Sequence, residues 1–547
     1  MRNFALLSKN SGGDGLDPVS EGNSSQLSNT LVGTPALNFH VEADGAGSLE
    51  LKPGSYVAFA SRGLEYTLDA QPFTISSGST TNLSFAIERV VDTTGYLSAD
   101  FHIHSAKSFD SSVPTTDRAV SFLASNVEVM VSTDHDYITD YGPIIAGLGV
   151  GSEMTSVIGD ELTGGNPVPE DATQGGVEAF PEGIGHWNAW PLTQFTSNRR
   201  NGAPPDEFIT PGTAIDRLRG MDSLAAIGET PDTADVVDWL TAIGIGEATG
   251  DDEVVMLNHP RAGFAGVVVI GMFNGLANPG GDPNVGGYDP TKAITDFPNS
   301  LLGIPSLYNS AVIGSGGTST TALSFDAVEV MNGSGVGSFL PVREDWCSLL
   351  KQDIRKTGTA VSDSHRLILE NAGYARSFVE SSTDDPAAAD EDELTDNVKD
   401  MKLVGTNGPF VRFTVKDDAN LEVGLGDTAA ATSSKVTVKI RVEAAPWIPV
   451  EEVRIYRNCE LIETRGIKSS KVLGKVLRFN QAINLSGIDD DSFLHVEAGV
   501  RLDASGNPLS PGLLTTVQTV APGVVPFAFT NPIFVDRQAD GYTPPGI

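Results

Sequence analysis

Residues 127–136 read VEVMVSTDHD, a short apolar run that ends in a cluster of polar side chains. A run of this kind, bounded by polar residues, is typical of a strand buried on both faces. Asp134 and His135 then lie where the strand leaves the core, and Asp136 follows them. The same pattern returns along the chain, so this stretch predicts the fold class as well as a candidate site.

A related pattern lies upstream at residues 100–105, which read DFHIHS. Side chains two positions apart on a strand point to the same side, so His102 and His104 share one face. Two imidazoles placed in this way can chelate one metal ion. Asp110 follows six positions after His104, close enough to loop back towards the pair.

Further apolar runs deliver polar side chains at their ends. EVVMLNHPR (253–261) ends in His259 with Arg261 beside it, and TGTAVSDSHR (357–366) ends in Asp363 and His365. Three other segments add candidates, namely GLGVGSEMT (147–155), GIGHWNAWPL (183–192) and FDAVEVMNG (325–333), with Glu153, His186, Glu329 and Asn332.

From residue 95 to about 405, apolar runs alternate with stretches of helical pattern at 117–125, 214–227, 234–243 and 344–357. Alternation of strand and helix predicts a parallel sheet or a β/α barrel. In such barrels the catalytic residues gather at the C-terminal ends of the strands. Six of the eight histidines lie in this region, and imidazole with carboxylate suits zinc, manganese or iron. We therefore expect a metal site at the mouth of the barrel.

The flanks have a different character. Residues 31–94 and 406–547 alternate apolar and polar positions, which predicts an N-terminal and a C-terminal β-sandwich. Residues 1–30 are rich in Gly, Ser and Asn and are expected to be a disordered tail. His40 and His495 lie on predicted strands of the flanks, where we expect structural roles.

Composition excludes several functions. Asp and Glu outnumber Lys and Arg by 71 to 35, a formal charge of −36, which disfavours binding to nucleic acid or anionic membranes. Two cysteines, Cys347 and Cys459, cannot make a disulfide framework or a Cys-rich zinc site.

No transmembrane segment or signal peptide is visible. The acidic composition and the β-rich flanks favour an extracytoplasmic or secreted protein that acts on a small molecule.

The ordered motif set resembles the polymerase and histidinol phosphatase (PHP) family of metal-dependent phosphoesterases. It comprises DFHIHS with Asp110, STDHD, GSEMT, HPR and SDSH, and it covers roughly residues 95–405. The resemblance implies a distorted (β/α)7 barrel with up to three metal ions. Within the family, GHWNAWPL, EVMNG and SDSH look most like the branch around carbaryl hydrolase (the CehA/McbA type), which cleaves a carbamate ester.

The resemblance also implies a set of ligands for two or three divalent ions (zinc, manganese or iron). His102, His104, Glu153 and Asp363 would hold the first ion. Glu153 would bridge to a second ion, held also by His186 and His259. A third would be held by Asp110, His135 and His365.

The expected activity is hydrolysis of a small-molecule ester, carbamate or amide by a hydroxide that bridges two metal ions. Two alternatives stay open, a phosphoesterase of the same family and a non-catalytic surface or carbohydrate-binding protein. Asp134 and Asp136 are expected either to orient imidazoles or to act as an acid for the leaving group. Arg261 is expected either to bind substrate or to form a salt bridge at the rim.

Overall fold

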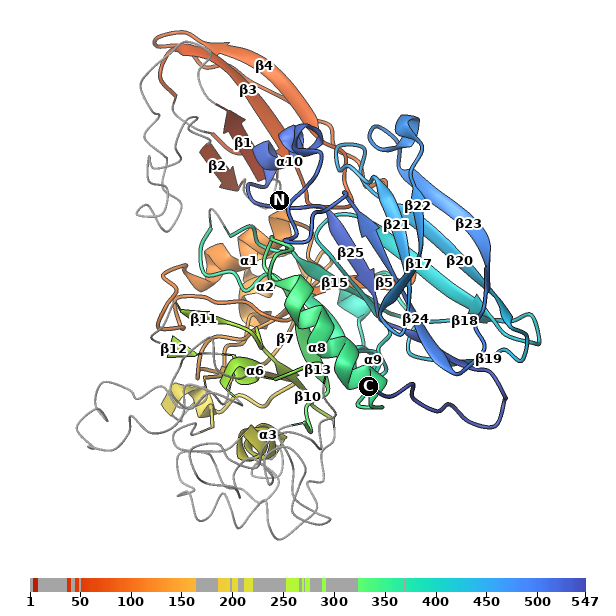
Figure 1. The fold of residues 1–547 in the computed structure, drawn as a ribbon. Coiled ribbons are helices and arrows are strands. Elements are labelled where there is room, and N and C mark those ends of the chain that lie inside the picture. The colour runs from red at the N-terminus through yellow and green to blue at the C-terminus, as the bar shows by residue number, and fades with distance from the viewer. Residues whose placement is uncertain are drawn as a thin grey trace.

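The computed structural model describes residues 3–7, 37–40, 45–48, 51–163, 185–196, 199–204, 211–219, 252–264, 268–269, 271–275, 288–291, 323–367 and 370–547. These residues form a mixed α/β structure with several sheets (Figure 1). None of the helices among them has the length and apolar character needed to cross a bilayer.

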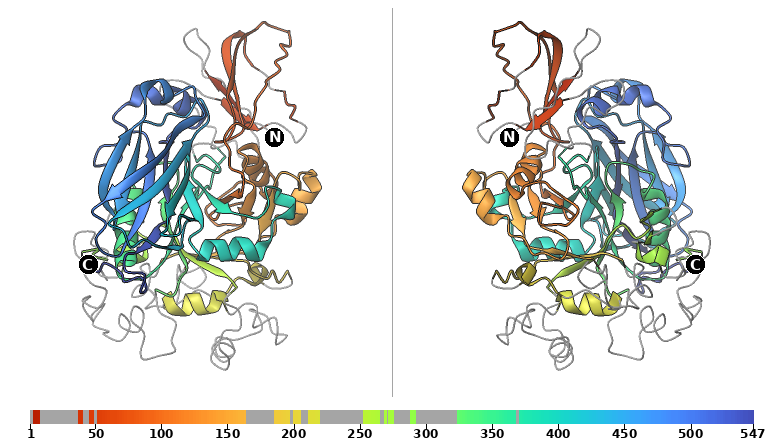
Figure 2. Two further views of the ribbon diagram at one scale, coloured as in Figure 1. Left: turned by 90° about the vertical axis from the view of Figure 1, so that its right-hand side faces the viewer. Right: turned by 90° about the vertical axis from the view of Figure 1, so that its left-hand side faces the viewer.

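An N-terminal antiparallel sheet projects from one end of the molecule (Figures 1 and 2). Its strand order is β2-β1-β3-β4, from Leu37–His40, Asn3–Leu7, Gly54–Ser61 and Asp69–Ile75. The strand β1 lies within the stretch expected to be a disordered tail, most of which falls outside the described residues. The described strands make one sheet here, where the sequence analysis expects a sandwich.

The central region contributes strands to two sheets. In one, β5 (Tyr96–Asp100), β6 (Val129–Val131) and β7 (Thr155–Val157) run parallel, and β15 (Arg376–Glu380) pairs antiparallel with β5. The other has the order β14-β13-β10-β9-β8, from Thr357–Val361, Ala327–Asn332, Val254–Leu257, Trp187–Trp190 and Asp160–Leu162. The apolar runs at 127–131, 254–257 and 360–361 therefore lie in strands, as expected, whereas the Gly-rich run before Glu153 does not.

These strands are buried on both faces. Every residue of β6, β10 and β14 is buried, because neighbouring layers cover both sides of each strand. Their side chains meet in one apolar cluster that includes Val129, Val131, Val254, Met256 and Val361. Burial on both faces explains why β6 and β10 are continuous apolar runs rather than alternating ones.

Helices surround the central strands. Those expected at 117–125 and 344–357 appear as α1 (Thr115–Ala124) and α8 (Phe339–Lys351). Only the first part of the one expected at 214–227 is described, as α3 (Pro211–Arg219), and the one expected at 234–243 lies outside the described residues. The remaining short elements are α2 (Gly142–Leu148), α6 (Met272–Gly275), α9 (Glu391–Lys399), β11 (Gly263–Phe264), β12 (Val268–Val269) and the 3-10 turns η3 (Arg199–Gly202) and η5 (Pro386–Ala388).

The C-terminal region packs two sheets over a shared apolar core. One has the order β18-β17-β20-β23, from Glu422–Val423, Phe410–Lys416, Lys435–Glu443 and Leu477–Ser486. The other contains β19 (Thr428–Ala430), β26 (Ile533–Asp536), β24 (Ser492–Gly499), β25 (Phe527–Thr530), β21 (Glu452–Arg457) and β22 (Glu460–Gly466). Short helical segments complete it, namely η6 (Ser469–Lys471), η7 (Pro511–Leu514) and α10 (Thr515–Val520).

Two connections join the C-terminal region to the central one. The strand β16 (Leu403–Thr406) pairs with β15 on one side and with β25 on the other, so one sheet continues across the boundary expected at residue 405. Cys347 on α8 and Cys459 at the β21–β22 turn form a disulfide that spans 112 positions. The two cysteines thus make one long-range crosslink.

Candidate metal centre

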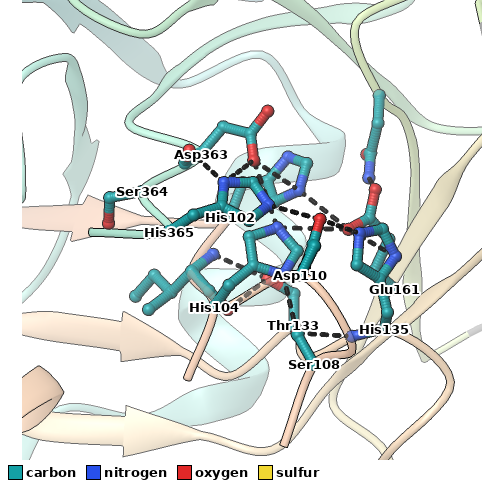
Figure 3. Close-up of polar contacts among 12 residues, drawn as sticks. His102, His104, Ser108, Asp110, Thr133, His135, Glu161, Asp363, Ser364 and His365 are labelled. Carbon is teal, nitrogen blue, oxygen red and sulfur yellow. Dashed lines mark hydrogen bonds and ion pairs between the residues drawn. The ribbon is translucent and has the colours of Figure 1, made fainter. Parts of the chain in front are cut away.

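One edge of the central strands gathers the polar residues found in the sequence. His102 and His104 follow β5, His135 follows β6, and Asp363 with His365 follows β14. The strands β5 and β6 are parallel neighbours and end at the same edge of one sheet, and a parallel bridge between Ile103 and Ser364 brings the end of β14 to this edge. Figure 3 shows them converging from separate segments.

His186 and His259 reach the same edge by opposite routes. His259 lies two residues after the end of β10, whereas His186 lies directly before the start of β9. Since β9 runs antiparallel to β10, the start of one strand and the end of the other share an edge. The backbone N–H of Asn258 donates to the His186 carbonyl at 3.0 Å, which fixes the two segments side by side.

Glu161 on β8 lies at the centre of the cluster. Its Oε2 is 3.0 Å from His102 Nε2, and the same oxygen is 3.2 Å from His104 Nε2 and 3.2 Å from His135 Nδ1. Its Oε1 lies 3.0 Å from His186 Nδ1 and 3.5 Å from His259 Nε2. One fully buried carboxylate therefore faces five imidazoles.

Two further carboxylates complete the cluster. Asp363 Oδ1 lies 3.1 Å from His104 Nε2 and 3.3 Å from His102 Nε2. Asp110 Oδ2 lies 2.9 Å from His365 Nε2 and 3.3 Å from His135 Nε2. The side chain of Asp110 is 34% exposed whereas Glu161 is completely buried, so Asp110 marks the side of the cluster that opens to solvent.

The donor atoms fall into four groups, each compact enough to hold a cation because its ligand atoms lie within 4.8 Å of one another. The groups are His104, Asp110, His135 and His365; His102, His104 and Glu161; His102, His259 and Asp363; and His135, Glu161 and His186. Imidazole nitrogen with carboxylate oxygen is a donor set for zinc, manganese or iron. The residues present fit a cluster of divalent ions.

The pKa values of Glu161, His104 and His186 suit metal ligation, whereas His135 would have to release a proton when an ion binds. Burial lowers the pKa of His104 to about 3 and that of His186 to about 4, so both rings are neutral at pH 7. Burial also acts to lower the pKa of His135, but the facing carboxylates outweigh it and raise the value to about 9. Burial acts to raise the pKa of Glu161, yet the imidazoles around it hold that pKa well below its usual range. Metal ligation requires ionised carboxylates and neutral imidazoles.

The backbone is strained where it delivers ligands. His259 and Asp363 have φ values of 24° and 48°, and Asp136, beside His135, has a φ of 49°. Non-glycine residues avoid positive φ, and such strain concentrates at functional sites. Three of the segments that form the cluster therefore hold conformations that the surrounding structure has to impose.

The structure places Glu153 away from the cluster. Its side chain forms an ion pair with Arg62 and is about a third exposed, and the carboxylate facing the imidazoles is that of Glu161 instead. Gly159 explains the difference, because a Cβ there would lie 2.6 Å from the Ala189 carbonyl oxygen and 2.7 Å from that of Ser132. This close approach carries the chain from β7 into β8 and turns Glu161 inward. The sequence does hold a signal for Glu161. The short apolar run Val157-Ile158-Gly159 comes directly before it and resembles the runs that precede the other candidate ligands.

Asp134 lies behind His104. It is fully buried and accepts hydrogen bonds from the hydroxyls of Ser105, Ser108 and Thr139 at 2.9, 3.1 and 2.5 Å. The Ser108 hydroxyl in turn lies 2.9 Å from His104 Nδ1. Of the two roles expected for Asp134, this geometry supports orientation of an imidazole.

Asp136 is placed in a similar way behind another ligand. It accepts hydrogen bonds from the backbone N–H and the hydroxyl of Thr163, at 3.0 and 2.8 Å. The Thr163 hydroxyl lies 3.1 Å from His135 Nδ1. Each of these two imidazoles is thus oriented by its own carboxylate through a hydroxyl group: His104 by Asp134 and His135 by Asp136.

Arg261 is engaged with the helix α8. Its guanidinium donates to both carboxylate oxygens of Asp345, at 2.6 and 2.5 Å, and to the Tyr288 carbonyl oxygen at 2.5 Å. Asp345 is completely buried. Of the two roles expected for Arg261, the geometry is that of a salt bridge.

Sequence reasoning assigned no role to Glu329 and Asn258. Glu329 accepts hydrogen bonds from His102 Nδ1 and from the backbone N–H of His259 (2.6 Å), and Asn258 donates to Glu161 Oε1 at 2.8 Å. Neither residue belongs to the four groups of candidate ligands, but both form hydrogen bonds that hold such ligands in place. Glu329 is among the candidates of the sequence analysis because it lies on an apolar run, but that run carries no histidine that would indicate its role.

We expect Glu329→Gln to lower metal affinity by roughly 10- to 100-fold, the usual cost of losing a carboxylate that orients a ligating imidazole. Titration of metal-free protein with Zn²⁺, followed by calorimetry, measures the change. Glu380→Gln is the matched control, because Glu380 also accepts a hydrogen bond, from Tyr96, but lies on β15 outside the cluster. Equal zinc affinities in the two variants would show that Glu329 does not contribute to metal binding.

The two remaining histidines lie outside the cluster. His40 lies on β2 of the N-terminal sheet. His495 is buried on β24, where its ring stacks on Tyr456 at 4.7 Å. The burial and stacking of His495 agree with the structural role expected for it, and the role of His40 stays a prediction.

Comparison of the sequence with protein-family models and with curated proteins finds no match.

Proposed function

We propose that the chain is a metal-dependent hydrolase with a di- or trinuclear centre of the PHP type. The observation that carries this proposal is the buried carboxylate of Glu161 with five imidazoles directed at its two oxygens. A structural core has no need of so many titratable groups, because burying them costs free energy that apolar side chains avoid. A set of bound cations balances that cost.

The topology supports a barrel around the cluster. Two residues separate β7 from β8, so the two central sheets are joined at one side by consecutive strands. At the other side, Ile103 after β5 makes a parallel bridge with Ser364 after β14. These links favour a closed ring of β5, β6, β7 with β8, β9, β10, β13 and β14, which has one strand more than the expected (β/α)7 barrel.

The residues divide the work of the site between them. His102, His104, Glu161 and Asp363 would hold one part of the metal cluster, His186 and His259 a second, and Asp110, His135 and His365 a third. Bound ions of this kind lower the pKa of a water molecule and polarise the oxygen of the bond to be cleaved.

The chain's own contribution is to position these groups. Glu329 holds Nδ1 of His102, so Nε2 of that ring faces Glu161. Ser108 does the same for His104, whose Nε2 faces Asp363. Orientation by such outer partners fixes the ring tautomer and its direction.

The substrate class we propose is an ester, carbamate or amide. Hydrolysis adds water to the acyl carbon, breaks the bond from that carbon to the leaving oxygen or nitrogen, and transfers a proton to the leaving group. Four arginines near the cluster have partners within the chain: Arg62 pairs with Glu153, Arg261 with Asp345 and Arg366 with Glu370, and Arg118 donates to the His104 carbonyl oxygen. This favours an uncharged acyl group over a multiply charged phosphate, which relies on cationic side chains.

Metal analysis paired with a substrate panel tests the proposal. We expect purified protein to carry two or three divalent ions and to hydrolyse an aryl carbamate or ester faster than an aryl phosphate. His102→Ala with His104→Ala should lose both the ions and the activity. Faster cleavage of the phosphate would replace the substrate class with the phosphoesterase alternative, and inertness of the metal-loaded protein towards every class would sink the hydrolase itself.

A further inference from the structure

Phe109 is an exposed aromatic side chain at the metal centre. Its 70% exposure is the highest among the exposed large apolar side chains in the described part of the chain. The others are aliphatic and lie in the C-terminal region, namely Leu421, Leu461, Ile462, Leu509 and Ile547. Single exposed apolar residues are ordinary on protein surfaces, so the surroundings of Phe109 decide what this one does.

The inner face of the Phe109 ring rests on a residue of the cluster. Its centroid lies 4.7 Å from that of His135, with an angle of 28° between the planes. His135 stacks in turn on His104 at 4.7 Å. The residue after Phe109 is Asp110, whose carboxylate contacts His135 and His365 on the solvent side of the cluster. Phe109 therefore stands on the solvent side of the cluster, next to Asp110 and against the ring of His135.

The loop that carries Phe109 is braced on both sides. The backbone N–H of Ala106 donates to the Val113 carbonyl oxygen at 2.7 Å, which closes the loop. The hydroxyl of Ser108 lies 3.1 Å from Asp134, and that of Ser111 donates to the His365 carbonyl oxygen at 2.9 Å. An aromatic ring held in this way loses little freedom when a ligand packs against it.

We propose that Phe109 is the platform on which an aromatic group of the substrate stacks, which makes aryl esters, aryl carbamates or anilides the substrate class of this site. The proposal rests on the proposed function. One face of the ring lies against His135, and most of the side chain is exposed on the solvent side of the cluster. A planar apolar group that is bound through its reacting end to the ions would bury that surface. Offset stacking of two rings adds to the gain from burial.

A binding measurement tests the platform without turnover. Phenylphosphonate and methylphosphonate present the same anionic group to the ions and differ in the ring alone. With zinc-loaded protein we expect the phenyl compound to bind about 10-fold more tightly, the scale of one aromatic contact. In Phe109→Ala this preference should fall to within about 2-fold, and Phe109→Tyr should retain it.

Hydrolysis supplies the second readout. For an aryl ester and an alkyl ester with leaving groups of similar pKa, Phe109→Ala should lower kcat/KM for the aryl ester alone, by about 10-fold. Leu509→Ala, which removes another exposed apolar side chain from the C-terminal region, is the control and should change neither value. An unchanged ratio of aryl to alkyl, in binding or in hydrolysis, would overturn the platform.

The platform and the hydrolase fail in different ways. His102→Ala could lose all activity while Phe109→Ala keeps the preference for aryl compounds. This result would support the proposed hydrolase and contradict the platform. The protein could instead bind phenylphosphonate tightly and through Phe109 but cleave no ester, carbamate or amide. That result would support the platform and contradict the proposed hydrolase.

Discussion

Glu161→Gln is expected to empty the metal centre and abolish hydrolysis, with the largest effect of any single substitution in this chain. The substitution keeps the shape of the side chain but removes the charge that faces five imidazoles. The loss of metal affinity should exceed the roughly 10- to 100-fold that follows from losing an outer partner. Elemental analysis of purified protein and calorimetric titration of metal-free protein both measure it.

Glu153→Gln is the matched control for Glu161→Gln. The two carboxylates are eight positions apart, and Glu153 is paired with Arg62 at the surface. We expect Glu153→Gln to retain the full complement of ions. A protein that loses its ions through Glu153→Gln and keeps them through Glu161→Gln would contradict the metal centre described here.

Removal of the disulfide has the second largest expected effect, on stability. Replacing Cys347 and Cys459 together by Ser opens a loop of 112 positions, and closing a loop of that length stabilises a folded protein by about 2–5 kcal/mol. The crosslink ties α8 of the central region to the β21–β22 turn of the C-terminal region. We therefore expect the C-terminal region to unfold at a clearly lower temperature in the double variant.

Calorimetric scans with and without reductant measure this effect. Wild-type protein should lose stability when dithiothreitol is added, whereas the double Ser variant should be indifferent to it. Identical wild-type scans in both conditions would show that the bond adds nothing. Since disulfides persist in oxidising compartments, a reductant-sensitive wild type also supports the extracytoplasmic location expected from composition.

The candidate site was largely predictable because its ligands are delivered by local patterns. The H-x-H spacing places His102 and His104 on one side, with Phe101 and Ile103 in apolar clusters on the other. His135 and Asp363 each follow an apolar run that becomes a buried strand. Such patterns need only the period of a strand and the position of its end.

The fold was predictable in its classes of element more than in their assembly. Most of the apolar runs of residues 95–405 lie in strands. The helix expected at 117–125 occurs within two residues of its expected bounds, whereas the one expected at 344–357 begins five and ends six residues earlier, as α8. The pairing of β16 with β25 could not be predicted in this way, because it joins residues more than 120 positions apart. No local pattern indicates that the central and C-terminal regions share one sheet.

By itself, the sequence determined that imidazoles and carboxylates emerge together from buried strands, since strand periodicity and burial act over a few residues. Only the tertiary structure decided that Glu161, rather than Glu153, meets those imidazoles, that Arg261 pairs with Asp345, and that the two cysteines join. Each of these depends on which distant segments touch. The approach of Gly159 to the carbonyl oxygen of Ala189, 30 positions away, is one such contact, and it is set by the packing of whole strands.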